Sequence, residues 1–381
     1  MFEVAVENLF NFASAEYALL FAKSSATAFQ HPAWLTGIYR RLLSHNKAAP
    51  LIIVVRNSID KSLAMVLPLV RRRYGTLKVI EFADLRVSDY SSAVTDPATF
   101  EAIKSDRAAR SGLLAALRPY DVLRLGKLQD GAMPLNALFG VSEQTSMGVN
   151  AYATSLDGSY EDWRASRLKP SYRKELDKKL RQLHRKGAVR FAQSTTSADI
   201  EETFDALRIF RRDRFEVNGG GELLQVPAYF DFYSSIALQT NFARTYTLWF
   251  EGKPIAGALG LTHKGSLLVI LGGFTQTEFK NQSIGSLLFQ EIARDCIERG
   301  EKLLDFTIGD EPYKLTFGAE PKPMWQMTRS GSLRGFAASV VVTKFPAARA
   351  LARNIFHRAH DKNAPTHSVP APRPDDEPIE V

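Results

Sequence analysis

The sequence lacks several features that would place it in a special class of protein. Its only cysteine, Cys296, cannot form an internal disulfide, and seven histidines with a single thiol give no zinc-ribbon or zinc-finger spacing. The longest apolar stretches, such as 51–55 and 267–274, are far shorter than the roughly 20 residues that span a bilayer. The first ten residues carry Glu3 and Glu7 where a signal peptide would be basic. We therefore expect no structural metal, no membrane-spanning helix and a cytoplasmic location.

The composition is that of an ordinary globular protein. Hydrophobic residues make up 45% of the 381 residues and charged residues 24%, and a chain of this length can bury a large core without disulfides. At roughly 100 to 200 residues per domain, the length indicates about two domains. The net charge of +8 favours anionic partners, but it does not distinguish nucleic acid from anionic lipid or phosphorylated small molecules.

Hydrophobic periodicity divides the chain into two α/β units. In the first unit, strand-like runs alternate with helical spacing. A stretch with several glycines and a proline, 129–148, breaks the periodicity and predicts a boundary between a first domain, 1–140, and a second domain, 150–332. In the first domain we expect strands at 2–6, 51–55, 63–70, 77–82 and 121–125, with helices at 17–22, 32–43 and 107–117.

The second unit begins with helices and continues as a meander of strands. Tight turns at Glu251-Gly252 and Lys264-Gly265 separate three apolar runs, which predicts consecutive antiparallel strands. A further amphipathic run, stopped by Gly300, predicts a helix. The expected elements are helices at 170–186, 198–214, 227–239 and 284–299, and strands at 244–250, 254–262 and 266–274.

The turn between this meander and the next helix predicts an anion site. An apolar stripe that begins at Ile284 fixes the buried face of the helix and leaves its N-terminus free. Free amides and the positive end of the helix dipole would hold a pyrophosphate, with Gly285 allowing close approach and Lys280 adding charge. An ordinary capped helix would give the same pattern. The predicted cofactor-binding residues here are Lys280, Asn281, Gln282, Ser283, Ile284, Gly285 and Ser286.

Four glycines lie inside the strands that precede this turn: Gly257, Gly260, Gly272 and Gly273. Glycine weakens a strand interior and often marks a bulge or a place where a ligand lies against the backbone. A pantetheine arm can pair with an exposed strand edge while its pyrophosphate sits at the helix N-terminus. Gly272 and Gly273 are therefore further candidates for cofactor contact.

Three segments resemble the acetyl-CoA-binding half of the GNAT acyltransferase superfamily: GKPIAGALGL (252–261), NQSIGSLL (281–288) and DFTIGDEPYKLTFG (305–318). They resemble more closely the bacterial CelD/BcsL-type acetyltransferases associated with cellulose and exopolysaccharide synthesis. QHPAWL (30–35), SDYSS (88–92) and SYRKELDKKLRQLHRKG (171–187) extend the resemblance to about residues 25–325. It implies an α/β fold of two GNAT-like domains with mixed, mostly antiparallel sheets and flanking helices, which is also the plan of the peptidoglycan-building Fem transferases.

The resemblance also implies direct transfer of an acyl group from acetyl-CoA, as a co-substrate, to an amine or hydroxyl of the acceptor, without a metal. Tyr313 would protonate the departing thiolate, and Asp305 or Glu311 would accept or position the acceptor's proton. Lys314 would contact phosphate. Packing of Tyr313 and a loop-capping role of Asp305 are the structural alternatives. The predicted function is that of an N- or O-acyltransferase acting on a polar, sugar-containing acceptor in polysaccharide or cell-envelope biosynthesis.

The segment 164–190 is strongly basic, with eleven lysines and arginines against only Glu175 and Asp177. As a helix it would present a positive stripe able to grip nucleic acid, anionic lipid or a nucleotide-linked substrate, although a solvated surface gives the same pattern. No recognition-helix, RNP or zinc-finger pattern accompanies it. We therefore do not expect nucleic acid as a partner.

Residues 321–360 contain no aspartate or glutamate, and residues 361–381 contain five prolines. This pattern predicts a basic helical segment at 333–360, interrupted at Pro346, and a disordered tail at 361–381. The basic segment would either lie against an anionic surface, peripheral at the inner membrane, or pack on the second domain. The sequence indicates no oligomeric state. The rival to an enzyme is a non-catalytic, membrane-associated scaffold of a polysaccharide-export assembly.

Overall fold

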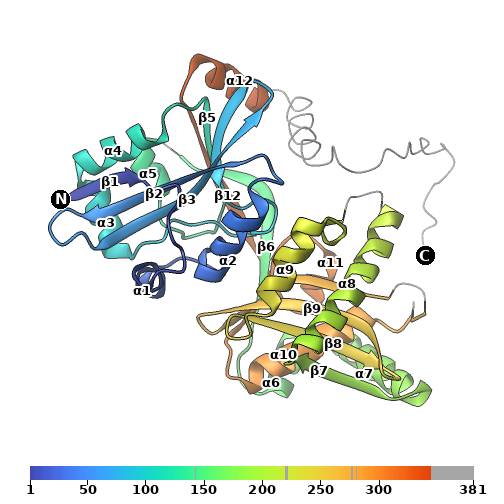
Figure 1. The fold of residues 1–381 in the computed structure, drawn as a ribbon. Helices are drawn as coiled ribbons and strands as arrows, with labels where there is room; N and C mark the ends of the chain where they lie inside the picture. Colours follow the sequence, from blue (N-terminus) through green and yellow to red (C-terminus); the bar gives the residue numbers. More distant parts are fainter. Residues whose placement is uncertain (142, 219–221, 276–277, 280, 345–381) are drawn as a thin grey trace.

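Twelve strands in the described part of the chain form one continuous mixed sheet in the computed structural model (Figure 1). The structure describes residues 1–141, 143–218, 222–275, 278–279 and 281–344. The strand order across the sheet is β1-β2-β3-β4-β5-β12-β6-β11-β10-β9-β8-β7. This order separates a first half, which holds β1 to β5 and α1 to α5, from a second half, which holds β6 to β11 and α6 to α11.

The first half contains the elements that its periodicity predicted. β2 and β3 form the expected hairpin, and the helix expected at 32–43 begins as α2 and continues as a π-helical turn to Leu42. The elements are β1 (Phe2–Val6), α1 (Ala15–Lys23), α2 (Pro32–Gly37), β2 (Ala49–Asn57), β3 (Leu63–Tyr74), β4 (Leu77–Phe82), α3 (Pro97–Ser105), α4 (Arg107–Leu117), β5 (Val122–Leu128) and α5 (Leu135–Phe139).

The second half contains the predicted meander, because β8, β9 and β10 are neighbours and pair antiparallel. Its elements are β6 (Thr145–Ser155), α6 (Tyr160–Arg167), α7 (Pro170–Lys186), β7 (Val189–Ser194), α8 (Ser197–Asn218), α9 (Pro227–Ala237), β8 (Ala243–Phe250), β9 (Lys253–His263), β10 (Ser266–Phe274), α10 (Ile284–Glu298), β11 (Leu303–Ile308) and α11 (Pro312–Thr316). The chain then continues into β12 (Glu320–Ser330) and α12 (Leu333–Lys344).

The stretch 129–148, which shows no periodicity in the sequence, contains α5 and the start of β6. A helix of five residues is too short to show a periodic pattern. β6 lies in the middle of the sheet between β11 and β12, and its sequence, TSMGVNAYATS, shows no clean alternation. Local pattern therefore could not reveal either element.

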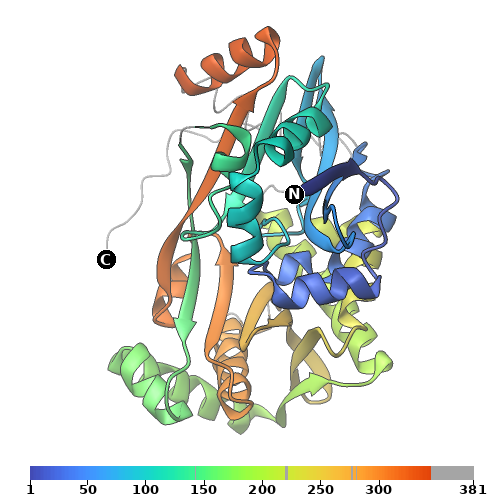
Figure 2. The same cartoon turned by 90° about the vertical axis from the view of Figure 1, so that its left-hand side faces the viewer.

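β12 joins the two halves of the sheet (Figure 2). Residues 320–326 pair antiparallel with β6, and residues 325–330 pair antiparallel with β5, so the two pairings overlap. α12, which follows, lies beside β12 and β5 (Figure 1). The sequence offered packing on the second domain as one alternative for the basic segment, whereas its described part lies at the first half. Residues 345–360 and the predicted tail 361–381 lie outside the described residues.

One hydrophobic core runs through both halves. It includes residues of α1, α2, α8 and α9 and buried side chains of β2, β3, β9 and β10. The ring of Trp34 in α2 lies 4.9 Å from the ring of Phe232 in α9, at an angle of 81°. Separate clusters cover the other face, under α3 to α5 in the first half and under α6, α7 and α10 in the second. Cys296 lies in the cluster of the second half and is fully buried.

Each half contains one pair of adjacent parallel strands that separate after a few residues. β4 and β5 pair only at Val79 and Ile80, and β10 and β11 pair only from Ser266 to Leu268. An irregularity between Val269 and Leu271 interrupts the pairing of β10 with β9. Strands that split in this way leave backbone edges that something else must cover.

Candidate active site

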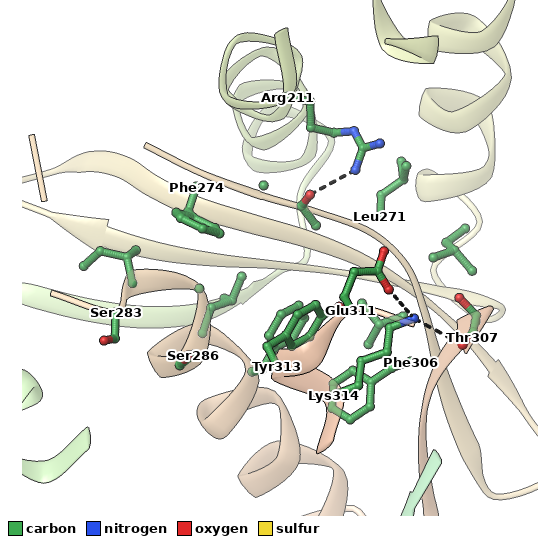
Figure 3. A pocket seen from close by; sticks show the side chains of 18 of the residues that line it. Arg211, Leu271, Phe274, Ser283, Ser286, Phe306, Thr307, Glu311, Tyr313 and Lys314 are labelled. Carbon is green, nitrogen blue, oxygen red and sulfur yellow. Dashed lines mark hydrogen bonds and ion pairs between the residues drawn. The ribbon is translucent and has the colours of Figure 1, made fainter. Parts of the chain in front are cut away.

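A cavity of about 680 Å³ lies where β10 and β11 separate (Figure 3). Its walls come from β10, the first turn of α10, the end of β11 and α11. Two further residues reach it from other elements: Arg211 from α8, and Asp89 from the first half of the chain. We call it the β10–β11 cavity.

The N-terminus of α10 opens into this cavity without a side-chain cap. Ser283, the N-cap residue, adopts a left-handed conformation with φ of 51°, and its side chain makes no capping hydrogen bond. Residues 283–286 all line the cavity. The first amides of a helix carry partial positive charge and need acceptors, so an anionic group fits this position.

Close packing explains why residue 285 is a glycine, which the sequence alone did not show. A Cβ atom placed on it would lie 2.8 Å from ring carbons of Phe274, at the end of β10. Gly273 is similar, because a Cβ there would lie 3.2 Å from side-chain atoms of Arg211 and Leu207 in α8. These glycines let helices approach the sheet closely, in addition to lining the cavity.

β11 ends in a strained turn that two predicted residues hold. Thr307 has a positive φ of 59°, which is costly for a β-branched residue. Its amide donates to Oδ1 of Asp305 at 2.7 Å. The Lys314 ammonium, only 2% exposed as a residue, donates to the carbonyls of Thr307, Ile308 and Gly309 at 3.3, 3.1 and 2.9 Å.

Lys314 is therefore engaged within the protein. Its Nζ also lies 2.9 Å from the Glu311 carboxylate (Figure 3). This arrangement uses the lysine to hold the turn after β11, whereas the sequence suggested a contact with phosphate. Lys314 and Glu311 both line the β10–β11 cavity.

Asp305 is held from the first half. The Tyr90 hydroxyl donates to its carboxylate, with distances of 2.8 and 3.0 Å to the two oxygens. Burial raises the pKa of Asp305 to about 6, although these hydrogen bonds oppose the change. Burial also raises the pKa of Tyr90 well above its ordinary value, so its hydroxyl stays a donor. Asp305 does not line the cavity.

Tyr313 lies in the cavity wall beside an aromatic cluster. Its ring stacks on Phe289 of α10, with centroids 5.3 Å apart and planes at 2°. The ring of Phe306 meets it edge-on at 6.0 Å. The stacking fixes the position of the phenol, which is half-buried.

The cavity brings together most of the predicted residues. Asn281 and Gln282 do not line it, and Lys280 lies outside the described residues. Asp89 and Arg211 were not predicted; the SDYSS segment was noted without a role, and nothing in the pattern of the 198–214 helix singled out Arg211.

No cluster of His, Cys, Asp and Glu that could hold a metal occurs among the residues with described positions. The predicted residues in the lining are Gly272, Gly273, Ser283, Ile284, Gly285, Ser286, Glu311, Tyr313 and Lys314.

Comparison with known proteins identifies the class of domain that contains the cavity. Residues 170–315 match the family model of the acetyltransferase (GNAT) domain, which covers α7 to α11 and most of the cavity. The chain therefore carries a GNAT acetyltransferase domain in its second half and is an acyltransferase enzyme. No curated protein matches the sequence.

Solved structures share the whole fold at low identity. The crystal structure of FemX is 10% identical, covering 88% of this chain and 99% of that chain with a TM-score of 0.60. L-PGS from Bacillus licheniformis is 14% identical, with coverages of 91% and 98% and a TM-score of 0.53. A conserved protein of unknown function from Bacteroides thetaiotaomicron is 11% identical, with coverages of 85% and 99% and a TM-score of 0.54. At these identities the likeness establishes the fold alone.

Proposed function

We propose that the enzyme transfers an acetyl group from acetyl-CoA to an amine or hydroxyl of a polar, sugar-containing acceptor in polysaccharide or cell-envelope biosynthesis. The observation that carries this proposal is the uncapped N-terminus of α10 beside the part of β10 beyond Leu268, which does not pair with β11. The pyrophosphate of CoA fits the helix end, and the amide groups of the pantetheine arm fit the strand edge. Both features open into the same cavity.

The wall of the cavity contains Tyr313, which is the proposed proton donor to the departing thiolate. In the proposed step the acceptor attacks the thioester, the acyl–sulfur bond breaks, and a new acyl–nitrogen or acyl–oxygen bond forms. The acceptor's proton passes to a carboxylate, and Tyr313 donates a proton to the sulfur of CoA. An ordinary phenol has a pKa of about 10, which makes a tyrosine a possible proton donor in such a step.

The biological setting rests on the sequence resemblance to CelD/BcsL-type acetyltransferases, whose fold plan the Fem transferases share. The fold shared with FemX is consistent with that setting. The alternative of a non-catalytic scaffold loses support, because residues 170–315 match an acetyltransferase domain and enclose a suitable cavity. No helix within the described ranges is both long and apolar enough to cross a membrane.

A pair of matched substitutions tests the cofactor site. Ser286→Asp adds a negative charge at the third residue of α10, and Thr99→Asp adds one at the third residue of α3 in the first half. A carboxylate in the first turn of a helix favours the helix by about 0.3–1 kcal/mol. Ser286→Asp should nevertheless weaken acetyl-CoA binding at least tenfold, or about 1.4 kcal/mol, because the carboxylate repels the pyrophosphate.

Isothermal titration calorimetry with acetyl-CoA measures the effect, and thermal unfolding shows that both variants are folded. Thr99→Asp should bind acetyl-CoA as the parent does. Equal affinity of the Ser286→Asp variant and the parent would place the pyrophosphate elsewhere. A parent chain that does not bind acetyl-CoA, and releases no thiol from it with glucosamine, ethanolamine or glycerol, would contradict the proposed function itself.

A further inference from the structure

The loop after β4 carries an acidic residue from the first half into the β10–β11 cavity. Asp89 is the only ionisable residue of the first half among the described residues that line this cavity. We propose that Asp89 is the carboxylate that binds the acceptor's nucleophilic group and accepts its proton during acyl transfer. This inference rests on the proposed function, and it adds to the enzyme a catalytic residue that lies outside the matched acetyltransferase domain.

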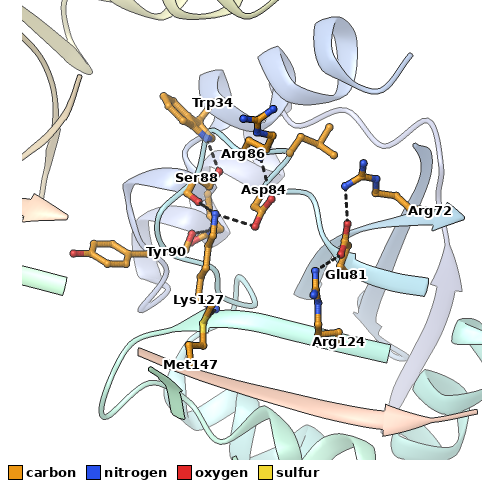
Figure 4. A network of polar contacts seen from close by, with 12 residues as sticks. Trp34, Arg72, Glu81, Asp84, Arg86, Ser88, Tyr90, Arg124, Lys127 and Met147 are labelled. Carbon is orange, nitrogen blue, oxygen red and sulfur yellow. Dashed lines mark hydrogen bonds and ion pairs between the residues drawn. The ribbon is translucent and has the colours of Figure 1, made fainter. Parts of the chain in front are cut away.

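The residue before Asp89 is fixed within the first half (Figure 4). The Lys127 ammonium donates to the carbonyl of Ser88 at 2.7 Å, and the indole of Trp34 donates to the Ser88 hydroxyl at 2.9 Å. Lys127 also forms an ion pair with Asp84 at 3.1 Å. The backbone amide of Ser91 donates to the carbonyl of Lys127 at 2.9 Å. These contacts hold the loop on both sides of Asp89.

The residue after Asp89 is fixed by the second half. Tyr90 is buried, and its hydroxyl donates to both oxygens of Asp305 in β11. The first half also holds Tyr90, because Gln30 donates to its carbonyl at 3.3 Å. The backbone of Asp89 is therefore positioned by contacts from both halves. Such a fixed placement is what a proton acceptor needs.

The other carboxylates near the cavity are less suited to this role. Asp305 uses both oxygens for Tyr90 and does not line the cavity. Glu311 lies in the lining, but its carboxylate pairs with the Lys314 ammonium at 2.9 Å. Asp89 is half-buried and lines the same cavity as Thr307 of β11.

The surroundings of Asp89 change the basicity of its carboxylate. Burial raises the pKa of its carboxyl group, while the Lys127 ammonium and the Thr307 hydroxyl act in the opposite direction. A carboxylate with a raised pKa is a stronger base than an exposed one. The charged and titratable groups around it are Lys127 of β5, Asp84 of its own loop, Asp305 of β11, Lys314 of α11, Tyr233 of α9 and Arg211 of α8.

The proposed step balances without another reagent. An O–H or N–H of the acceptor gives its proton to Asp89 as the acceptor attacks the thioester carbon. The acyl–sulfur bond breaks, the acyl group stays on the acceptor, and the thiolate takes a proton from Tyr313. Asp89 and Tyr313 return to their starting states by exchanging one proton through solvent.

An Asp89→Cys variant tests the position without knowledge of the natural acceptor. The single native cysteine, Cys296, is 0% exposed, so an introduced thiol can be followed by itself. A thiol at position 89 should take the acetyl group of bound acetyl-CoA by thiol–thioester exchange, and bound CoA should slow its reaction with iodoacetamide. Asp130→Cys, at an exposed site of the first half, is the control and should show neither effect. Mass spectrometry of the intact chains measures both.

The outcomes separate the inference from the function on which it rests. Acetylation or protection at position 89 but not at position 130 supports the placement. Acetyl-CoA binding by calorimetry, with position 89 neither acetylated nor protected, overturns it. Failure of the parent chain to bind acetyl-CoA overturns the proposed function, and the role of Asp89 with it.

The chemical role is tested by turnover with any of glucosamine, ethanolamine or glycerol that the parent acylates. Asp89→Asn should lower turnover by about 10² to 10⁴ with little change in the KM for acetyl-CoA. It should also remove the acidic limb of the pH–rate profile, and Asp89→Glu should restore part of both. A parental rate and profile in Asp89→Asn would overturn the proton-accepting role.

Discussion

Each half of the chain contains a pair of parallel strands that separate, and the gap between the separated strands is filled differently in the two halves. Each half has a residue with positive φ in the second strand of its pair, Lys127 at 57° in β5 and Thr307 at 59° in β11. In the first half, the loop between β4 and α3 covers the gap, and Val94 exchanges two backbone hydrogen bonds with Val66. In the second half the gap is the β10–β11 cavity.

The helix after the first strand of each pair shows the same contrast. Asp96 caps α3 by accepting from the amide of Thr99 at 2.9 Å, whereas the cap residue of α10 makes no such bond. A smaller cavity of about 450 Å³ remains beside α3, but Glu101 and Asp130 line it. Its acidic lining and capped helix are unsuited to a pyrophosphate. The proposed ligand site therefore lies in the half whose helix end is uncapped, whereas the corresponding gap in the first half is covered by a loop.

The largest expected effect tests whether chemistry belongs to the second half. Tyr313→Phe keeps the stacking on Phe289 but removes the hydroxyl. Turnover should fall by about 10² to 10⁴, equivalent to roughly 2.7–5.4 kcal/mol of transition-state stabilisation, while acetyl-CoA affinity stays nearly constant. Steady-state kinetics and calorimetry measure the two quantities. Tyr160→Phe, on α6 away from the cavity, is the control, and parental turnover in Tyr313→Phe would leave this tyrosine with a packing role.

The second prediction concerns the buried lysine that holds the turn of β11. Lys314→Met removes the donor to three carbonyls and the partner of Glu311. The free energy of unfolding should fall by about 3–5 kcal/mol, as expected when one member of a buried network is lost. Urea denaturation measures this change, and Lys302→Met at an exposed site should alter it by less than about 0.5 kcal/mol. Weaker acetyl-CoA binding without any loss of stability would instead favour a contact with phosphate.

The third prediction tests the joint between the halves. The pKa of Asp305 is about 6 in the folded protein, above the value of about 3.9 expected for an unfolded chain. The folded state therefore binds the proton more tightly, and Asp305 stabilises the fold most below pH 4. Its contribution should fall by roughly 2–3 kcal/mol as pH rises from about 4 to about 7.

Asp305→Asn can keep the bonds to Tyr90 and Thr307, but it cannot ionise. Urea denaturation between pH 4 and 7 should therefore show a shallower fall of stability in this variant than in the parent. Asp310→Asn is the control, because hydrogen bonds lower the pKa of Asp310 and its effect has the opposite sign. Identical pH profiles for the parent and Asp305→Asn would show that this carboxyl titrates normally.

The smallest expected effect concerns the exposed surface of α12, which lies beside the first half. α12 exposes Leu333 and Phe336, at 89% and 61%, and belongs to the basic segment. We expect the protein to bind anionic but not neutral vesicles, with each basic residue near the surface contributing about 1 kcal/mol before screening. Deletion of residues 333–381 should abolish sedimentation with such vesicles, and higher salt should weaken it.

A Leu333→Ser, Phe336→Ser double variant keeps every charge and separates apolar insertion from electrostatic attraction. Its vesicle binding should be weaker than that of the parent but still sensitive to salt. Equal partitioning of the full-length and truncated chains would show that this segment does not bind membranes.

Local sequence was sufficient to predict most of the elements and one part of the site. The amphipathic stripe from Ile284 predicted α10, and the turns at Gly252 and Gly265 predicted the meander, because periodic burial and turn geometry depend on near neighbours. Elements without such a pattern were missed, among them α5, which is too short, and β6 and β12, which owe their place to strands far away in the chain. The helices α3 and α6 and the strand β7 were not predicted either.

The sequence by itself determined which segments could be helix or strand and where a helix N-terminus follows a strand. Only the tertiary structure decided what faces that helix end. Tyr90 and Asp305 are 215 residues apart in the chain, yet their hydrogen bond aligns the two halves. The same alignment brings Asp89 to the wall of the β10–β11 cavity. Such contacts come from strand pairing and from a shared core, which join segments far apart in the chain. They cannot be predicted from a local sequence pattern.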